Sequence, residues 1–299
     1  MRRVRGRFAP SPTGPLHLGS LRTALAAWLT ARSAGSEFLV RIEDLDPQRS
    51  RREFERGQLE DLRSLGIDWD GAPVRQSERM ARYEAALGEL RAAGRLYPCF
   101  CTRAEIRKAA SAPHGDLPGG AYPGTCRSLS EAERRARITA GRPYALRVDA
   151  GAPRISFTDR LLGEQSAVVD DFVVRRADGV PAYQLAVVVD DAAQGVEEVV
   201  RGADLADSTP RQLLLAGWLG LPAPAYAHVG LVLGGDGARL AKRHGGATLA
   251  DRGEPVSATL ATLAHTLGLA CGRDAVSDAA QLLDGFDAAA LPPGAVTLE

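Results

Sequence analysis

The sequence predicts an α/β protein with a parallel sheet, and three features of the N-terminal region support this fold class. Residues 4–8 are expected to form a short strand, apolar side chains recur at helical spacing over residues 21–29, and residues 38–42 are expected to form a second strand, which is apolar. A strand, a helix and a second strand in this order form a βαβ unit, whose strands run parallel. Because such sheets bind ligands at the carboxyl ends of their strands, the loops after these two strands are candidate functional sites.

Composition and charge are those of an ordinary globular protein. The 299 residues are 45% hydrophobic and 25% charged, which excludes a disordered or fibrous chain. Its 37 basic residues balance 37 acidic ones, so any polyanionic partner must be held by local patches. Lys108 and Lys242 are the only lysines, and all the other basic residues are arginines.

No segment is expected to cross a membrane. The longest uncharged run, residues 212–235, contains Pro222, Pro224 and His228, which interrupt any apolar helix of about 20 residues. The apolar stretch 24–31 follows three prolines and is expected to be a buried helix rather than a signal peptide. We therefore expect a cytoplasmic protein whose four cysteines are reduced.

The remaining elements complete the α/β pattern. Helices are predicted over residues 54–65 and 78–93, strands over residues 145–148, 196–201 and 227–233, and a hairpin around residues 155–165. Ser208, Thr209 and Pro210 are expected to open another helix, with a hydroxyl group as its cap and proline at the first helical position. The expected segments are two halves of a main domain (1–96 and 146–246), an inserted cysteine-containing module (97–145) and a short C-terminal helical segment (247–299).

The loop after the first strand reads Arg7-Phe8-Ala9-Pro10-Ser11-Pro12-Thr13-Gly14-Pro15-Leu16-His17-Leu18-Gly19-Ser20. A backbone that turns sharply after a strand and then opens a helix presents unpaired N–H groups, which suit a nucleotide phosphate. His17 adds a hydrogen-bond donor, and Gly19 allows a flat base or a ribose to approach closely. The alternative interpretation is a turn rich in proline and glycine with a surface histidine.

The loop after the second strand is acidic and reads Arg41-Ile42-Glu43-Asp44-Leu45-Asp46. A carboxylate at the end of a parallel strand lies where α/β proteins bind their ligands, and it can pair with an ammonium group. A solvated acidic turn is the alternative.

A third motif, Ala238-Arg239-Leu240-Ala241-Lys242-Arg243-His244-Gly245-Gly246, contains one of the two lysines. An ammonium group is a compact point charge on a flexible stem, whereas guanidinium is a planar fork. Lys242 between two arginines therefore indicates a position that requires the point charge. A loop that carries this charge suits a triphosphate whose charge shifts during a reaction.

Together these motifs resemble those of the glutamyl-tRNA synthetase group of class I aminoacyl-tRNA synthetases. Residues 7–20 are similar to the group's HIGH region, residues 239–243 to its KMSKS loop, and residues 41–46 to its Arg-Ile-Glu-Asp-x-Asp motif. Further matches are Asp170-Asp171-Phe172-Val173, Tyr183, residues 188–191 and Val200-Arg201-Gly202. The resemblance is collinear from Arg5 to about Gly246, and it implies a Rossmann-like catalytic domain with an inserted small zinc-binding module.

The resemblance also implies an enzyme that activates L-glutamate with ATP, with Mg²⁺ accompanying the ATP. The implied glutamate-binding residues are Arg7, Phe8, Ala9, Pro10, Ser11, Glu43, Tyr183 and Arg201. The implied ATP-binding residues are His17, Gly19, Ser20, Arg239, Leu240 and Lys242, of which His17 and Lys242 are the catalytic pair. In the KMSKS-like loop, Arg239 and Ala241 depart from the lysine and serine that the family commonly has.

The chemistry of this set fits glutamate. Glu43 suits the ammonium group of the amino acid, and Arg7 and Arg201 suit its two carboxylates. Because paired guanidinium and carboxylate groups match in charge and geometry, they select glutamate over neutral glutamine.

The segment after the third motif is short. Fifty-three residues follow Gly246, fewer than a helical anticodon-binding domain needs. We therefore expect no anticodon-binding domain, and the chain resembles the short paralogues, the glutamyl-Q tRNA(Asp) synthetases, which transfer glutamate to queuosine in the anticodon loop of tRNA(Asp). The alternatives are a minimal glutamyl-tRNA synthetase that charges the 3′ end of tRNA(Glu), a non-catalytic RNA- or zinc-binding paralogue, and a nucleotidylyltransferase.

Three clustered cysteines, Cys99, Cys101 and Cys126, offer three of the four ligands of a tetrahedral zinc site. From composition alone His114 is the natural fourth ligand, whereas the resemblance implies Tyr122, because residues 122–126 match the family's Tyr-x-x-x-Cys spacing. We predict one structural Zn²⁺ held with Tyr122, keeping His114 and a metal-free set of reduced thiols as alternatives. The distant Cys271 is expected to be a core residue.

Contact with tRNA is expected from local basic patches. One candidate patch follows the cysteine module and comprises Arg127, Arg134, Arg135, Arg137 and Arg142. A solvated helix face, with Glu131 and Glu133 interleaved, explains it equally well. A second candidate patch comprises Arg2, Arg3 and Arg5. We expect the protein to be a monomer.

Overall fold

Two sets of parallel strands form the centre of the protein. The computed structural model describes residues 5–102, 104–106, 121–237, 248–269 and 276–297. The first set runs in the order β1 (Gly6–Phe8), β2 (Phe38–Ile42) and β3 (Val74–Arg75). The second set runs in the order β9 (Glu198–Gly202), β10 (Ala225–Val229) and β6 (Arg154–Asp159). The sets meet where the amides of Glu197 and Glu198 donate to the carbonyl of Arg5, just before β1. The predicted α/β fold with a parallel sheet is confirmed.

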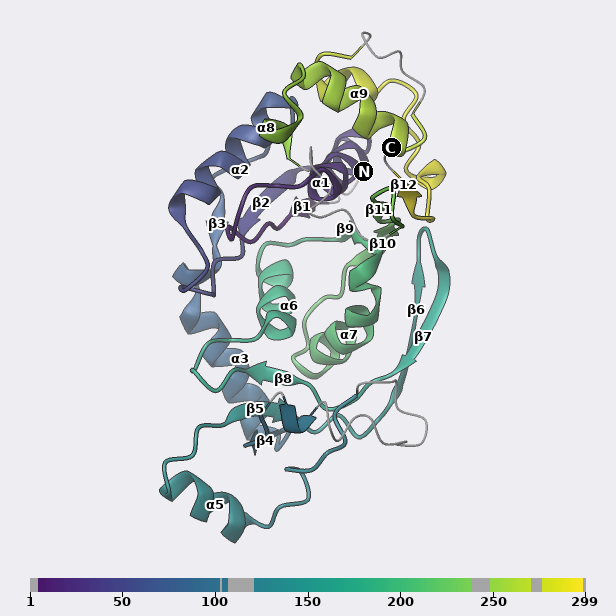
Figure 1. The fold of residues 1–299 in the computed structure, drawn as a ribbon. Coiled ribbons are helices and arrows are strands. Elements are labelled where there is room, and N and C mark those ends of the chain that lie inside the picture. The colour runs from purple at the N-terminus through teal and green to yellow at the C-terminus, as the bar shows by residue number, and fades with distance from the viewer. Residues whose placement is uncertain (1–4, 103, 107–120, 238–247, 270–275, 298–299) are drawn as a thin grey trace.

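Most of the helices pack around these strands, whereas the helix at residues 131–139 lies apart from them (Figure 1). The helices are α1 (Leu18–Ser33), α2 (Arg52–Ser64), α3 (Met80–Ala92), α5 (Glu131–Thr139), α6 (Tyr183–Ala193), α7 (Thr209–Trp218), α8 (Leu249–Arg252) and α9 (Val256–Thr266). Helix α1 is central, because it lies between the strands and α9 and buries Leu21, Leu25 and Leu29 completely. Its apolar character on nearly all sides is typical of such a sandwiched helix. No described helix is long and apolar enough to cross a membrane.

The cysteine-containing region lies at the opposite end of the molecule from α9 (Figure 1). Strands β4 (Leu96–Cys99), β5 (Ala145–Val148) and β8 (Val173–Arg175) form a small antiparallel sheet there. Tyr97, Phe100 and Tyr122 pack with two of the cysteines in a separate small core. The predicted hairpin is formed by β6 and β7 (Gly163–Val168), and it runs along one side of the molecule (Figure 1).

The C-terminal segment packs against α1 and pairs with the short strand that follows β10. Besides α8, α9 and two short 3-10 turns (Ala279–Leu282 and Ala288–Ala290), it supplies strand β12 (Val296–Thr297), which pairs in parallel with β11 (Val232–Leu233). The sequence predicts a short helical segment here, without this strand. The added strand forms because the Val296 amide donates to the carbonyl of Leu231. Gly230 next to it has no side chain, which lets the backbone of Gly294 approach closely.

Some predicted boundaries are wrong for identifiable reasons. Ser208 does not cap α7, because it has helical backbone angles at the end of the 3-10 turn Ala203–Ser208, and its hydroxyl accepts from the amide of Gln184 instead. Pro210 is the second residue of α7, one position later than predicted, because the helix already begins at Thr209. The strand expected over residues 227–233 is broken at Gly230 into β10 and β11, since Gly230 turns toward the C-terminal segment and its amide donates to the carbonyl of Pro292.

Candidate active site

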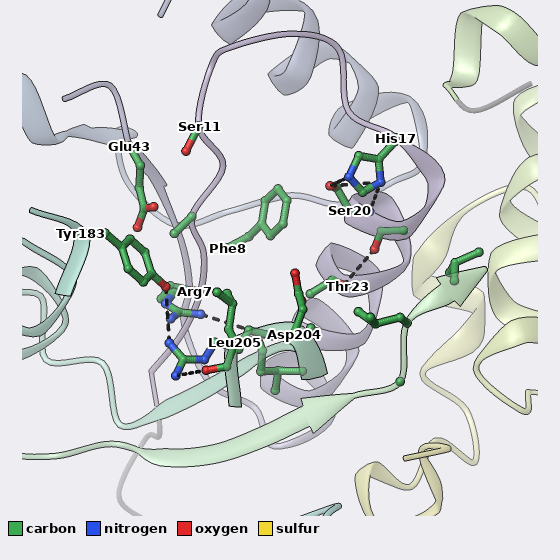
Figure 2. A pocket seen from close by; sticks show the side chains of 18 residues that line it. Arg7, Phe8, Ser11, His17, Ser20, Thr23, Glu43, Tyr183, Asp204 and Leu205 are labelled. Carbon is green, nitrogen blue, oxygen red and sulfur yellow. Dashed lines mark hydrogen bonds between the residues drawn. The ribbon is translucent and has the colours of Figure 1, made fainter. Parts of the chain in front are cut away.

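A cavity of about 390 Å³ opens at the carboxyl ends of β1, β2 and β9. Figure 2 shows Glu43, Ser11 and Tyr183 on one side of it, His17 and Ser20 on the other, and Phe8 between them. Its lining includes ten residues predicted from the sequence, namely Arg7, Phe8, Ala9, Ser11, His17, Gly19, Ser20, Glu43, Tyr183 and Arg201. Pro10 belongs to the same loop but does not line the cavity. Arg239, Leu240 and Lys242 lie outside the described residues.

The loop between β1 and α1 is held by hydrogen bonds from the end of β2 and from α2. The Pro10 carbonyl accepts from the amide of Glu43, which fixes this loop against the end of β2. The buried amide group of Gln58 on α2 donates to the carbonyls of Ser11 at 3.0 Å and Gly14 at 2.7 Å. Proline has no N–H and glycine has little conformational preference, so a loop rich in both needs such external hydrogen bonds to keep one shape.

His17 ends this loop as the N-cap of α1. Its Nδ1 lies 3.2 Å from the amide of Ser20 and accepts its hydrogen bond. In the neutral ring the proton is then on Nε2, which lies 3.1 Å from the hydroxyl oxygen of Ser20. The backbone of His17 also bridges to Thr248 in the C-terminal segment. The helix begins at Leu18, earlier than the periodicity predicts, because the imidazole satisfies the Ser20 amide.

The amino-acid end of the cavity contains a buried network of alternating charges. Asp191 on α6 accepts from Nη1 of Arg41 at 2.6 Å and from Nε of Arg7 at 3.4 Å. Arg41 also approaches Glu43, with 3.5 Å between Nη2 and Oε1. Burial alone would raise the pKa of Asp191, but the two guanidinium groups hold it below its ordinary value. The pKa of Glu43 is raised, because burial outweighs the attraction of Arg41 and Arg7.

Arg201 on β9 is held differently. It donates to Nε2 of His228 at 3.0 Å and to the hydroxyl of Thr209 at 2.9 Å, and its Nη1 lies 3.5 Å from the hydroxyl oxygen of Tyr183. Burial raises the pKa of Tyr183, so this hydroxyl keeps its proton at neutral pH.

The sequence did not identify several residues that shape the site. Asp191 and Arg41 lie in stretches that match the family's motifs, but the resemblance implies no role for either of them. Nothing in the sequence marks Gln58, Asp159 or His228 as site residues. A buried polar residue in an otherwise apolar strand or helix is the available signal, and all five side chains are buried.

The three thiols converge in the antiparallel region. The sulfur atoms of Cys99, Cys101 and Cys126 all lie within 4.8 Å of one another, and no other such group of potential ligands occurs in the described ranges. The Tyr122 hydroxyl oxygen is 3.4 Å from the sulfur of Cys99 and 3.5 Å from that of Cys101. In a tetrahedral site with Zn–S bonds of roughly 2.3 Å and a Zn–O bond of roughly 2.0 Å, the sulfur and oxygen atoms lie about 3.5 Å apart. The four donors therefore fit one zinc ion. His114, Lys108 and Cys271 lie outside the described residues.

The candidate basic patches are partly engaged in internal contacts. Arg127 pairs with Asp171 at 3.1 Å, Arg135 pairs with Glu131 on α5, and Arg134 and Arg137 lie over the rings of Tyr97 and Phe100. In the second patch, Arg5 pairs with Glu37, while Arg2 and Arg3 lie outside the described residues.

A parallel α/β sheet with a HIGH-like loop at its carboxyl edge defines a class I synthetase catalytic fold, and comparison with known proteins agrees. Residues 3–271 match the family described as tRNA synthetases class I (E and Q), catalytic domain. A glutamate-tRNA synthetase from Elizabethkingia anophelis superimposes with a TM-score of 0.85 at 28% identity, covering 100% of this chain and 68% of its own. A glutamate tRNA ligase from Elizabethkingia meningosepticum, solved with its amino acid, gives 0.84 at 28% identity, covering 100% of this chain and 67% of its own.

Two curated relatives are considerably more similar. The glutamyl-Q tRNA(Asp) synthetase of Nocardia farcinica is 57% identical, over 96% of this chain and 90% of the relative. That of Symbiobacterium thermophilum is 51% identical, over 96% of this chain and 93% of the relative. The chain therefore belongs to the class I tRNA synthetases of the E and Q type, in the group named glutamyl-Q tRNA(Asp) synthetase. The predictions of this family and of an enzyme are confirmed.

Proposed function

We propose that this protein activates L-glutamate with ATP and transfers the glutamyl group to queuosine in the anticodon loop of tRNA(Asp). One observation carries the proposal. A single cavity presents an acidic group, two guanidinium groups and a neutral hydroxyl on one side, and a histidine-capped helix start on the other. This matches an amino acid with two carboxylates placed beside a triphosphate.

At the amino-acid end, Glu43 pairs with the ammonium group of glutamate. Arg7 and Arg201 pair with its two carboxylates, and the Tyr183 hydroxyl supplies a directed hydrogen bond. Arg7 has part of its charge compensated by Asp191, whereas Arg201 is held by uncharged groups. A side-chain amide would leave one guanidinium group without a counter-charge, so glutamine is disfavoured.

At the nucleotide end, His17 and the start of α1 bind the phosphates of ATP, which arrives with Mg²⁺. A carboxylate oxygen of glutamate attacks the α-phosphorus, the bond to pyrophosphate breaks, and Lys242 stabilises the charge that develops on the phosphates. A queuosine hydroxyl then attacks the carbonyl carbon of the adenylate, and AMP leaves with the former carboxylate oxygen. No protein nucleophile takes part, because positioning and electrostatic stabilisation supply the catalysis.

The proposal includes one structural zinc ion held by Cys99, Cys101, Tyr122 and Cys126. Zinc at this position would tie β4 to the loop that follows Tyr122, and it would add to the stability of a region with a small apolar core.

Glutamate-dependent ATP–pyrophosphate exchange tests the activation step. Wild-type protein should exchange pyrophosphate only when L-glutamate is present, and Lys242→Ala should reduce the rate by about 100-fold or more, as expected when a group that stabilises transition-state charge is removed. Lys108→Ala is the matched control, since it removes the only other lysine, and it should exchange at the wild-type rate. Full exchange by Lys242→Ala would remove Lys242 from the mechanism.

A further inference from the structure

The hydrogen-bond partners of Arg201 are all neutral. Within the described residues, its guanidinium group donates to His228 Nε2, the Thr209 hydroxyl, the Leu205 carbonyl and the Tyr183 hydroxyl. Its ring partner is Tyr226, whose centroid lies 5.1 Å from the guanidinium carbon. Arg7 and Arg41 differ, because both pair with the carboxylate of Asp191. The charge of Arg201 is therefore not compensated by any of these partners.

The contact with His228 fixes the protonation of the imidazole ring. Arginine can only donate, so Nε2 of His228 must be unprotonated to accept from Nε of Arg201 at 3.0 Å. The ring proton is then on Nδ1, which lies 2.6 Å from Oδ2 of Asp159. His228 and Asp159 are completely or almost completely buried, so water does not offer either group another partner.

The two oxygens of Asp159 have separate tasks. Oδ1 accepts from the amides of Leu161, Leu162 and His228, at 3.0, 2.9 and 3.2 Å. Oδ2 faces the imidazole. Three backbone donors on one oxygen prevent the carboxylate from rotating, so the atom that faces His228 is always the same one.

We propose that Asp159 and His228 are positioning residues that hold Arg201 through a neutral acceptor and so reserve its charge for a carboxylate of the amino-acid substrate. The inference rests on the proposed function and deepens it. An aspartate in place of His228 would hold Arg201 equally well, but it would compensate the charge that attracts the substrate. A neutral imidazole orients the guanidinium group without this cost, provided that the ring keeps the proton on Nδ1.

Asp159→Asn tests this arrangement most sharply. The three backbone amides should hold the carbonyl oxygen of the new side chain, which turns its NH₂ group toward Nδ1 of His228. The proton of the imidazole must then move from Nδ1 to Nε2. A protonated Nε2 cannot accept the hydrogen bond of Arg201, so this bond is lost. We expect the KM for glutamate to rise by about tenfold or more, the size expected when a hydrogen bond of a charged group is lost. The KM for ATP should stay within about twofold of the wild-type value, because the ATP end of the cavity is unchanged.

Two further variants separate positioning from a merely structural effect. Glu198→Gln is the matched control, because it also changes a buried carboxylate in the same sheet, but its partner is Arg160. It should leave the KM for glutamate unchanged. His228→Gln offers a carbonyl to Arg201 and an NH₂ group to Asp159, so its KM for glutamate should rise far less than that of His228→Ala.

The kinetic constants come from ATP–pyrophosphate exchange, and the Kd of L-glutamate is measured separately by calorimetry. A glutamate KM within about twofold of wild type in Asp159→Asn would overturn the inference, since a tautomer change in a catalytic network has far larger effects. An equal rise in both KM values would also overturn it. A wild-type protein that binds glutamate without catalysing exchange would contradict the proposed function, while the calorimetric comparison would still decide the role of Asp159.

Discussion

The guanidinium group of Arg22 donates a hydrogen bond of 2.5 Å to the carbonyl of Gly230, where the cavity wall meets the C-terminal segment. Arg22 also donates to the carbonyl and the hydroxyl of Thr266 on α9, and its side chain is completely buried. Burial lowers its pKa to about 10, so the group remains charged at neutral pH. One buried cation thus joins α1, α9 and the wall of the cavity.

Replacing Arg22 with methionine should weaken ATP binding selectively. Gly230 lies two residues before Val232, and Val232 faces Gly19 at the ATP end of the cavity. The Cβ of Val232 is 3.8 Å from the position that a Cβ on Gly19 would take. We expect Arg22→Met to raise the KM for ATP by about threefold to tenfold, which corresponds to a loss of up to about 1.4 kcal/mol. Arg32→Met, at the far end of the same helix, is the control and should not change it. A selective rise in the KM for glutamate would contradict this account.

The KM for glutamate should depend on pH through Glu43. Only the ionised carboxylate attracts the substrate's ammonium group, and burial raises the pKa of Glu43 above its ordinary value. As the pH falls, the KM should therefore begin to rise at a higher pH than for an exposed glutamate. Glu43→Gln should raise the KM at neutral pH by about tenfold to 100-fold and remove this pH dependence. Measuring the KM from pH 5 to pH 8 tests the prediction, and an unchanged profile in the variant would refute it.

Asp191 should contribute strongly to stability. Its pKa is held low by Arg41 and Arg7 against the effect of burial, so its contribution is present above the unfolded-state pKa and is lost as the pH falls through the lowered folded-state value. Asp191→Asn leaves two buried guanidinium groups without their shared carboxylate and should reduce the free energy of unfolding by about 3 kcal/mol. Asp178→Asn, in the exposed pair with Arg176, should change it by less than about 0.5 kcal/mol. Urea unfolding at pH 7 measures both, and similar losses would speak against a special role for Asp191.

Metal analysis should identify the fourth zinc ligand. Wild-type protein and His114→Ala should retain one zinc ion per chain after dialysis against a weak chelator. Tyr122→Phe and Cys126→Ser should lose it, because each removes one of the four converging donors. Loss of zinc from His114→Ala with retention in Tyr122→Phe would assign the ligand to the histidine. Zinc-free wild-type protein would favour three reduced thiols.

The sequence predicts the principal groups of the site because they lie in short motifs at the ends of strands. Arg7, Glu43 and Arg201 each sit on or directly after a parallel strand, so one fold-class prediction brings them together. The roles of Asp191 and His228 could not be predicted in this way. They depend on how α6 packs against β2 and on how β10 aligns with β6, and these contacts join residues 150 and 69 positions apart in the chain. The missing cap at Ser208 has the same origin, since a tertiary contact with Gln184 replaces a local one.

The acceptor of the activated glutamate distinguishes transfer to queuosine from the charging of tRNA(Glu). Purified tRNA(Asp) with queuosine, tRNA(Asp) without it, and tRNA(Glu) should be incubated separately with the protein, ATP, Mg²⁺ and labelled L-glutamate. Label should be incorporated into the queuosine-containing tRNA(Asp) alone. Incorporation confined to tRNA(Glu) would contradict the proposed function and would identify a minimal glutamyl-tRNA synthetase.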